Sequence, residues 1–313
     1  MPILGTVSSG YVELPYALSQ TFNASGTYTV PSGKTKIAAF VVSGGGAGGH
    51  TGNNPYAQGA GAGGGASGYL VAFSDYSVTS GQQFAVTIGA GGTNPDRFSS
   101  SNNGGTSSFG NLVTVNGGNA GSTVPDYQSS NTTPTYAGGS AGSYTSNIPS
   151  YIVTTANNNT GGGAGGPRSM ANTPAGGYNG VSGTAGSNGG LLVNMNLTGL
   201  GSVSSGINTG SGGGGGSGAF TTYWSNNVAN NTGGNGGAGG TGSGSGGKGG
   251  QFNGGSNNDQ GGYPYTDAVS GGAATGTAGG GGGASGQQGT IGYSFNPATG
   301  GGGYAGQVVV YVQ

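Results

Sequence analysis

The amino-acid sequence predicts an all-β protein: a jelly-roll-like β-sandwich that carries an inserted bundle of glycine-rich polyproline II helices and has essentially no α-helix. Short stretches of β-branched and aromatic residues, bounded by glycine and turn residues, recur over residues 20–118. Glycine runs fill most of residues 119–303. The chain then ends in GQVVVYVQ, residues 306–313, a strand that needs a partner in the sheet formed by the earlier strands.

The first two strands are predicted at 27–30 and 35–43, joined by a Pro31-Ser32-Gly33 turn. From residue 37 onward, the second strand places apolar side chains on both of its faces. It is therefore expected to be a central, buried strand. Further strands are predicted at 69–73, 83–89, 105–109 and 112–116.

This pattern divides the chain into four regions. Residues 1–19 form an N-terminal arm, too short for a domain of its own, that we expect to dock onto another subunit or component. The sandwich occupies 20–118 and contains a glycine-rich excursion at 44–68. Residues 119–303 form the bundle and its display loops, and 304–313 close the sandwich, so that both ends of the insertion are anchored.

Composition limits the possible functions. The 313 residues include 83 glycines, no cysteine and only 4% charged residues, and the formal net charge is -1. The basic residues are scattered, so no nucleic-acid partner is predicted, and disulfides cannot form. We recognise neither a signal peptide nor a membrane span, so we expect synthesis in a cytoplasm and no membrane partner. A nearly neutral, amide-rich surface favours a protein that is part of an assembly.

The glycine runs raise the question of whether such a chain is ordered. In GGNGGAGGTGSGSGGKGG, residues 233–250, glycine occupies positions 233, 236 and 239, and also 234, 237 and 240. A polyproline II helix has about three residues per turn, so two such tracks give it two faces without side chains. Helices of this kind can approach until the N–H groups of one meet the carbonyl oxygens of another.

Similar runs recur at 44–49, 59–68, 161–166, 212–218, 279–286 and 300–303. Their number, their similar length and the strands around them favour an ordered bundle. Three alternatives remain open at this stage: a flexible linker, a collagen-like helix and silk-like β-stacking. Collagen is disfavoured because the period of three slips at 243–245 and proline is scarce in the runs.

Four stretches resemble glycine-rich domains of bacteriophage tail-fibre and other virion proteins. They are YTVPSGKTKIAAFVVSGGGAGG, GAGGGASGYLVAFSDYSVTSGQQFAVTIGAGG, GGTSSFGNLVTVNGG and GGGGYAGQVVVYV. The sequence is similar, more distantly, to the glycine-rich region of anaplastic lymphoma kinase-type receptors, and MPILGTVSS resembles the start of virion proteins of cyanobacterial phages. Residues 119–299 match only in composition.

The resemblance implies a structural protein on the virion surface, a fibre or a fibre-tip adhesin whose loops bind a host cell-surface glycan. It also implies a homo-oligomer, with a trimer favoured, and other virion proteins as partners of the N-terminal arm. The alternative is a non-adhesive structural subunit, either a capsid-decorating fibre or a self-polymerising extracellular filament.

Residues suited to catalysis are scarce, and we expect no enzyme, no cofactor and no metal site. His50 is the single histidine, and the acids are Glu13 and five aspartates without suggestive spacing. Asp75 and Asp96 are interpreted as turn residues that flank strands. No phosphate-binding loop sequence occurs, because Lys248 in SGGKGG is followed by glycine.

Aromatic residues between the glycine runs are the candidate contacts for a receptor or a neighbouring subunit. Sugar rings stack on exposed aromatic faces, while amide and hydroxyl groups bind sugar hydroxyls. The alternative interpretation is that each ring fills a gap between helices or lies in a subunit interface. The candidates, all expected at loop tips, are Tyr144, Tyr151, Tyr223, Trp224, Tyr263 and Tyr265.

Overall fold

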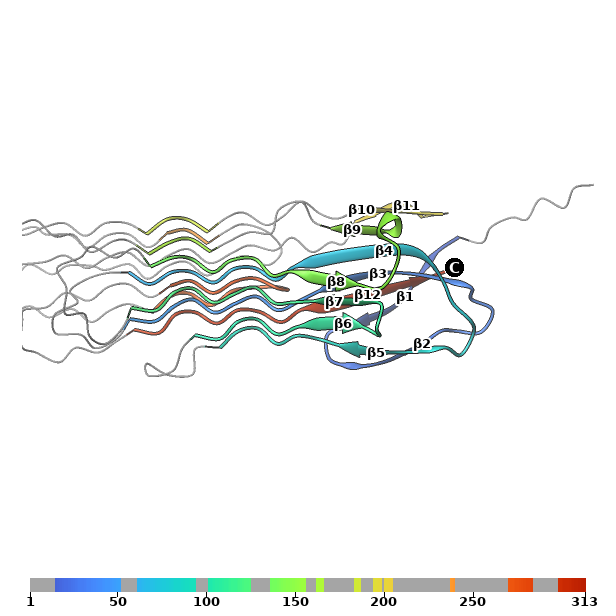
Figure 1. Cartoon of the computed structure of the whole chain (residues 1–313), viewed down its shortest axis with the longest axis horizontal. Coiled ribbons are helices and arrows are strands. Elements are labelled where there is room, and N and C mark those ends of the chain that lie inside the picture. The colour runs from blue at the N-terminus through green and yellow to red at the C-terminus, as the bar shows by residue number, and fades with distance from the viewer. Residues whose placement is uncertain are drawn as a thin grey trace, which may run out of the picture.

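Two antiparallel sheets form a β-sandwich, and extended glycine-rich segments continue from its strands (Figure 1). In this computed structural model the first sheet has the order β1 (Ala17–Phe22), β12 (Gln307–Val312), β3 (Lys36–Val42), β4 (Leu70–Ser77), β9 (Val153–Thr155). The second has the order β2 (Gly26–Thr29), β5 (Gln83–Thr87), β6 (Ser107–Phe109), β7 (Val113–Val115), β8 (Tyr144–Ser146). The structure describes residues 15–51, 61–93, 101–124, 136–155, 162–165, 183–186, 194–198, 200–204, 237–239, 270–283 and 298–313.

The all-β prediction is confirmed, because the described residues contain no α-helix and only one short 3-10 helix, η1 (Ser150–Ile152). The closing strand β12 lies between β1 and β3. This agrees with the expectation that the terminal strand pairs within the sheet formed by the earlier strands. The strands on either side of the Pro31 turn, however, do not pair with each other. One belongs to each sheet, so the turn at Gly33, where φ is 76°, carries the chain across the sandwich.

The strands also extend beyond the predicted boundaries of the sandwich. Strand β1 begins at Ala17, so the last residues of the predicted arm belong to the sheet. Strands β8 and β9 come from the region assigned to the bundle, and each forms one edge of a sheet. Asp75 does not lie in a turn beside a strand: it lies within β4, at φ 57°, where the register with β3 shifts.

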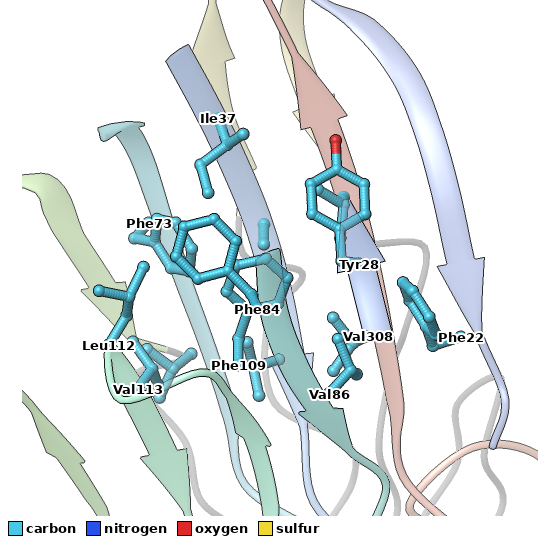
Figure 2. Close-up of a cluster of buried hydrophobic side chains, with 14 of the residues drawn as sticks. Phe22, Tyr28, Ile37, Phe73, Phe84, Val86, Phe109, Leu112, Val113 and Val308 are labelled. Carbon is cyan, nitrogen blue, oxygen red and sulfur yellow. The ribbon is translucent and has the colours of Figure 1, made fainter. Parts of the chain in front are cut away.

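The core lies between the two sheets and is built by alternate residues of their strands (Figure 2). Phe109 is at its centre, with ring-centroid distances of 5.9 Å to Tyr28, 5.9 Å to Phe73 and 5.0 Å to Phe84. From β12, Val308, Val310 and Val312 face this core. Central strand β3 is buried on both faces, as its sequence predicted.

A second apolar cluster explains why the other face of β3 is buried. The hairpin of β10 (Asn194–Leu197) and β11 (Gly201–Ser204) packs Met195 and Leu197 with Phe40 and Leu70 on the outer face of the first sheet. The sequence did not predict this hairpin, because its short apolar run is surrounded by glycine. It therefore belongs to the sandwich in space although it lies within the glycine-rich region in sequence.

Residues 43–51 form the central segment of the bundle, and their N–H groups show how the bundle is held together. The acceptor segment changes at each successive residue and repeats every third. Gly44 and Ala47 donate to 101–105, Gly45 and Gly48 to 298–304, and Gly46 and Gly49 to 61–68, with N···O distances of 2.8–3.1 Å. This repeat is that of a polyproline II helix, which has about three residues per turn and no internal hydrogen bonds.

The carbonyl groups of the central segment follow the same period with a different set of partners. Gly44, Ala47 and His50 accept from Gly118, Gly121 and Val124, while Gly45 accepts from Gly92 and Gly46 from Gly281. The partners that accept its N–H groups run antiparallel to it, and those that donate to its carbonyl groups run parallel. The central segment is thus surrounded by neighbours on all sides, and the ordered bundle rather than a flexible linker is confirmed for the described segments.

Glycine is required in the central segment because the neighbouring backbones leave no room for side chains. A Cβ atom on Gly45 or Gly48 would overlap with the carbonyl oxygen of Gly279 or Gly282. A Cβ atom on Gly46 would overlap in the same way with the carbonyl oxygen of Asn119. The third track carries the side chains of Ala47 and His50. The two side-chain-free tracks that were predicted from residues 233–250 are thus observed in the central segment. Of residues 233–250 themselves, the structure describes only 237–239.

Buried serines satisfy backbone groups where strands change into bundle segments. A β-ladder repeats every second residue and the bundle every third, so some N–H and C=O groups lose their partners at the junction. The Ser43 hydroxyl accepts the Tyr69 N–H at 2.8 Å and donates to the Asn116 carbonyl at 2.9 Å. The Ser107 hydroxyl accepts the Gly89 N–H at 2.9 Å. Both serines are completely buried.

Adjacent glycines offer a matched test of the packing argument. A Cβ on Gly301 would overlap with the Gly272 carbonyl oxygen, whereas a Cβ on Gly302 lies 3.6 Å from its nearest neighbour, the Gly92 oxygen. We expect Gly301→Ala to lower the free energy of unfolding by about 1–3 kcal/mol or more. Gly302→Ala should leave it unchanged or raise it by about 0.4–1 kcal/mol. Denaturant midpoints measure both, and equal midpoints would contradict the packing argument.

Replacing Ser43 tests the junction. Ser43→Ala removes a completely buried hydroxyl that bonds the Tyr69 N–H and the Asn116 carbonyl group, so the free energy of unfolding should fall by about 1–3 kcal/mol. Ser80→Ala is the control, because Ser80 also accepts a backbone N–H, that of Gly33, but does so on an exposed surface where water can replace it. That variant should stay within about 0.5 kcal/mol of the unmodified chain. A loss as large as that of Ser43→Ala would refute the assigned role.

Alkaline pH should destabilise the sandwich through Tyr28. Burial raises the pKa of the Tyr28 hydroxyl above 10.0, and the hydrogen bond with Ser19 opposes this only in part. The unfolded chain therefore loses the Tyr28 proton at a lower pH than the folded chain, so the contribution of Tyr28 to stability is constant well below pH 10.0 and falls as the pH rises above it. Unfolding curves against pH should show a smaller decline in Tyr28→Phe. An identical decline in both chains would contradict the assignment.

Candidate functional site

The described part of the bundle extends, on the side away from the sandwich, to a small apolar cluster of Ala62, Val124, Tyr136 and Ala298. Thr51 joins this cluster to the central segment, because its N–H donates to the Ala298 carbonyl at 3.0 Å. Segments that are far apart in sequence therefore reach the same level in the bundle. We call this level the distal end; residues 52–60 and 125–135, which connect these segments, lie outside the described residues.

Tyr144 is not at a loop tip, contrary to the sequence-based expectation. It is the first residue of β8, opposite Val115 in the register, at the junction of bundle and sandwich. Its ring lies 5.6 Å from that of Tyr69, and its exposed fraction is 36%. The contact with Tyr69 fits the alternative interpretation of these aromatics, in which a ring fills a gap between neighbouring segments.

Tyr151 is strongly exposed but is not at the distal end of the bundle. It lies in η1, and 86% of its surface is accessible. The chain reaches η1 by running along β8 away from the bundle, and the Asn147 N–H donates to the Leu112 carbonyl in the β6–β7 turn. Tyr151 is therefore separated from the distal end by the length of the sheet. The other four candidates, Tyr223, Trp224, Tyr263 and Tyr265, lie outside the described residues.

Tyr304 is an exposed aromatic residue that sequence reasoning missed. It was assigned to the closing strand, but it precedes β12 and lies in the last bundle segment, with 48% of its surface exposed. The available signal was its position in GGGGYAGQ. A large side chain takes up space between closely packed backbones, so it is most easily accommodated at the surface of the bundle.

Charged groups are sparse in the described part of the chain, where Asp75 is the sole acid. Its carboxylate accepts a hydrogen bond from the Tyr16 hydroxyl at 3.1 Å and lies 4.0 Å from the Lys36 ammonium group. This arrangement fastens the start of β1 to the bulge in β4. His50 is buried in the bundle, 6% exposed.

The same residues show no group of three or more histidine, cysteine or acidic side chains that could hold a metal ion. No helix in the described part of the chain is long and apolar enough to cross a membrane.

Comparison with known proteins identifies a glycine-rich domain in this chain. A search of curated proteins gave no match. Residues 19–251, which include most of the sandwich strands and the central bundle segment, match the model of the glycine-rich domain family, and the chain belongs to that family.

Proposed function

We propose that the protein is a structural virion fibre or fibre-tip protein, an adhesin of a bacteriophage that binds host cell-surface glycans through loops on its glycine-rich scaffold. The observation that supports the proposal is that antiparallel bundle segments come together at the distal end. Thr51 and Ala62 lie there on one antiparallel pair of segments, and Val124 and Tyr136 lie there on another. The sequence that connects the members of each pair therefore starts and ends on a hydrogen-bonded support.

Three further features support this function. Backbone hydrogen bonds hold the bundle together, so the sequence beyond the distal end can vary without disturbing the fold. The nearly neutral chain suits a neutral polyhydroxylated ligand. Weak sugar contacts gain avidity from repeated copies, so we propose a homo-oligomer, a trimer, on the virion surface. Of the predicted arm, residues 1–19, Tyr16 and the start of β1 belong to the sandwich, and we propose that the residues before Tyr16 dock onto another virion protein.

The aromatic residues between the glycine runs test this proposal. An array of bacterial surface polysaccharides, probed with the intact chain, should show binding that falls about tenfold or more in a Tyr223→Ala and Trp224→Ala double variant, because each lost stacking contact is worth about 1 kcal/mol. Tyr151→Ala is the control, since it removes an exposed ring that is remote from the distal end. Unchanged binding by the double variant would refute the role of these residues.

One observation favours the alternative of a non-adhesive subunit, either a capsid-decorating fibre or an extracellular filament. Leu18 on edge strand β1 is 60% exposed, and it pairs with the half-buried Tyr311 of β12. An edge strand without charged residues is a site where another chain can pair. Polymerisation of the purified protein, measured by light scattering, together with no binding to the array, would support this alternative and contradict the adhesin.

A further inference from the structure

A surface pocket of ≈ 600 Å³ opens where the bundle meets the sandwich. It is lined by Asn23 after β1, by Gly276 and Thr277 in the turn between two bundle segments, and by residues 303–306. Its volume falls in the range of about 300–1,000 Å³ that is typical of small-molecule sites. None of these lining residues is charged, so the pocket suits a neutral ligand.

Backbone hydrogen bonds hold the walls of the pocket in place. The Tyr304 N–H donates to the Gly279 carbonyl and the Tyr304 carbonyl accepts the Gly45 N–H, both at 2.9 Å. The Ala278 N–H, directly after Thr277, donates to the Ala305 carbonyl at 2.9 Å. Because its main chain is fixed on both sides, Tyr304 presents its side chain at the surface of the bundle, and a ligand would not have to order these segments on binding.

The groups around the pocket combine one aromatic ring with neutral hydrogen-bonding side chains. The Asn23 Oδ1 atom accepts a hydrogen bond from Gln307 Nε2 at 2.7 Å, which orients the amide and leaves its Nδ2 as a donor. Thr277 contributes a half-buried hydroxyl group. A pyranose has an apolar face that stacks on an aromatic ring and hydroxyl groups at its rim that bind amides and hydroxyls.

We propose that this pocket binds a neutral sugar unit, with the ring stacked on Tyr304 and its hydroxyl groups bound by Asn23 and Thr277. The site goes beyond the proposed function, because it lies at the base of the bundle and not at the distal end. It depends only on the pocket residues and is independent of whether the distal loops bind a receptor.

Saturation-transfer NMR on the intact chain tests the pocket, with the methyl glycosides of glucose, galactose and N-acetylglucosamine as probes. At least one glycoside should bind, and sorbitol, which has no ring face, should not. We expect Tyr304→Ala to raise the Kd about tenfold, and Tyr304→Phe to stay within about threefold of the unmodified chain because the ring face is kept. Asn23→Ala should weaken binding as well, through the loss of its hydrogen bond.

Tyr151→Ala is the matched control, and it should leave the Kd unchanged. The Tyr223→Ala and Trp224→Ala double variant should also bind the glycoside normally, so a failure of the distal adhesin would be distinguished from a failure of this pocket. The proposal is overturned if no glycoside binds, if sorbitol binds equally well, or if Tyr304→Ala binds with unchanged affinity. Amide chemical shifts of Thr277 and Tyr304 that do not respond to a bound glycoside would overturn it as well.

Discussion

Hydrogen bonds between the backbones of neighbouring extended segments determine the architecture of this protein. A polyproline II helix has no internal hydrogen bonds, so each N–H and carbonyl group must find a partner on another segment or in water. In residues 43–51 the partner changes at every residue and repeats at every third. That pattern requires neighbours on all sides and close approach to them. Missing side chains are what allow this approach, and glycine is therefore the structural residue of the bundle.

The sandwich supplies what the bundle lacks, which is a fixed starting register. Glycine loses more backbone entropy than other residues on ordering, so an isolated glycine run would remain unfolded. Strands β3, β4 and β12 lie side by side in one sheet and continue directly into bundle segments (Figure 1). Their aromatic and aliphatic core therefore sets the positions from which the segments start. Ser43 and Ser107 then carry hydrogen bonding across the change from a two-residue to a three-residue repeat.

This division of roles is suited to a support for recognition elements. Stability resides in the core and in backbone contacts, neither of which depends on side chains at the surface of the bundle. The same backbone contacts build the pocket beside Tyr304, where a single aromatic side chain is fixed at the rim of an otherwise glycine-rich wall. In a chain with 4% charged residues, most polar side chains are amides and hydroxyls. Both the distal end and the pocket can use such chemistry.

The sequence by itself determined the strand-forming stretches, the burial of 37–42 on both faces, the return of 307–312 to the sheet and the three-residue repeat of the glycine runs. These features are local, because they follow from side-chain alternation and from the absence of Cβ atoms. Only the tertiary structure decided that β2 and β3 belong to different sheets, that the β10–β11 hairpin covers Phe40, and that Tyr144 packs on Tyr69. Tyr304 and Asn23 likewise meet across most of the chain length. Glycine runs carry no side-chain pattern that specifies which segments become neighbours, so these pairings depend on the register set by the sandwich.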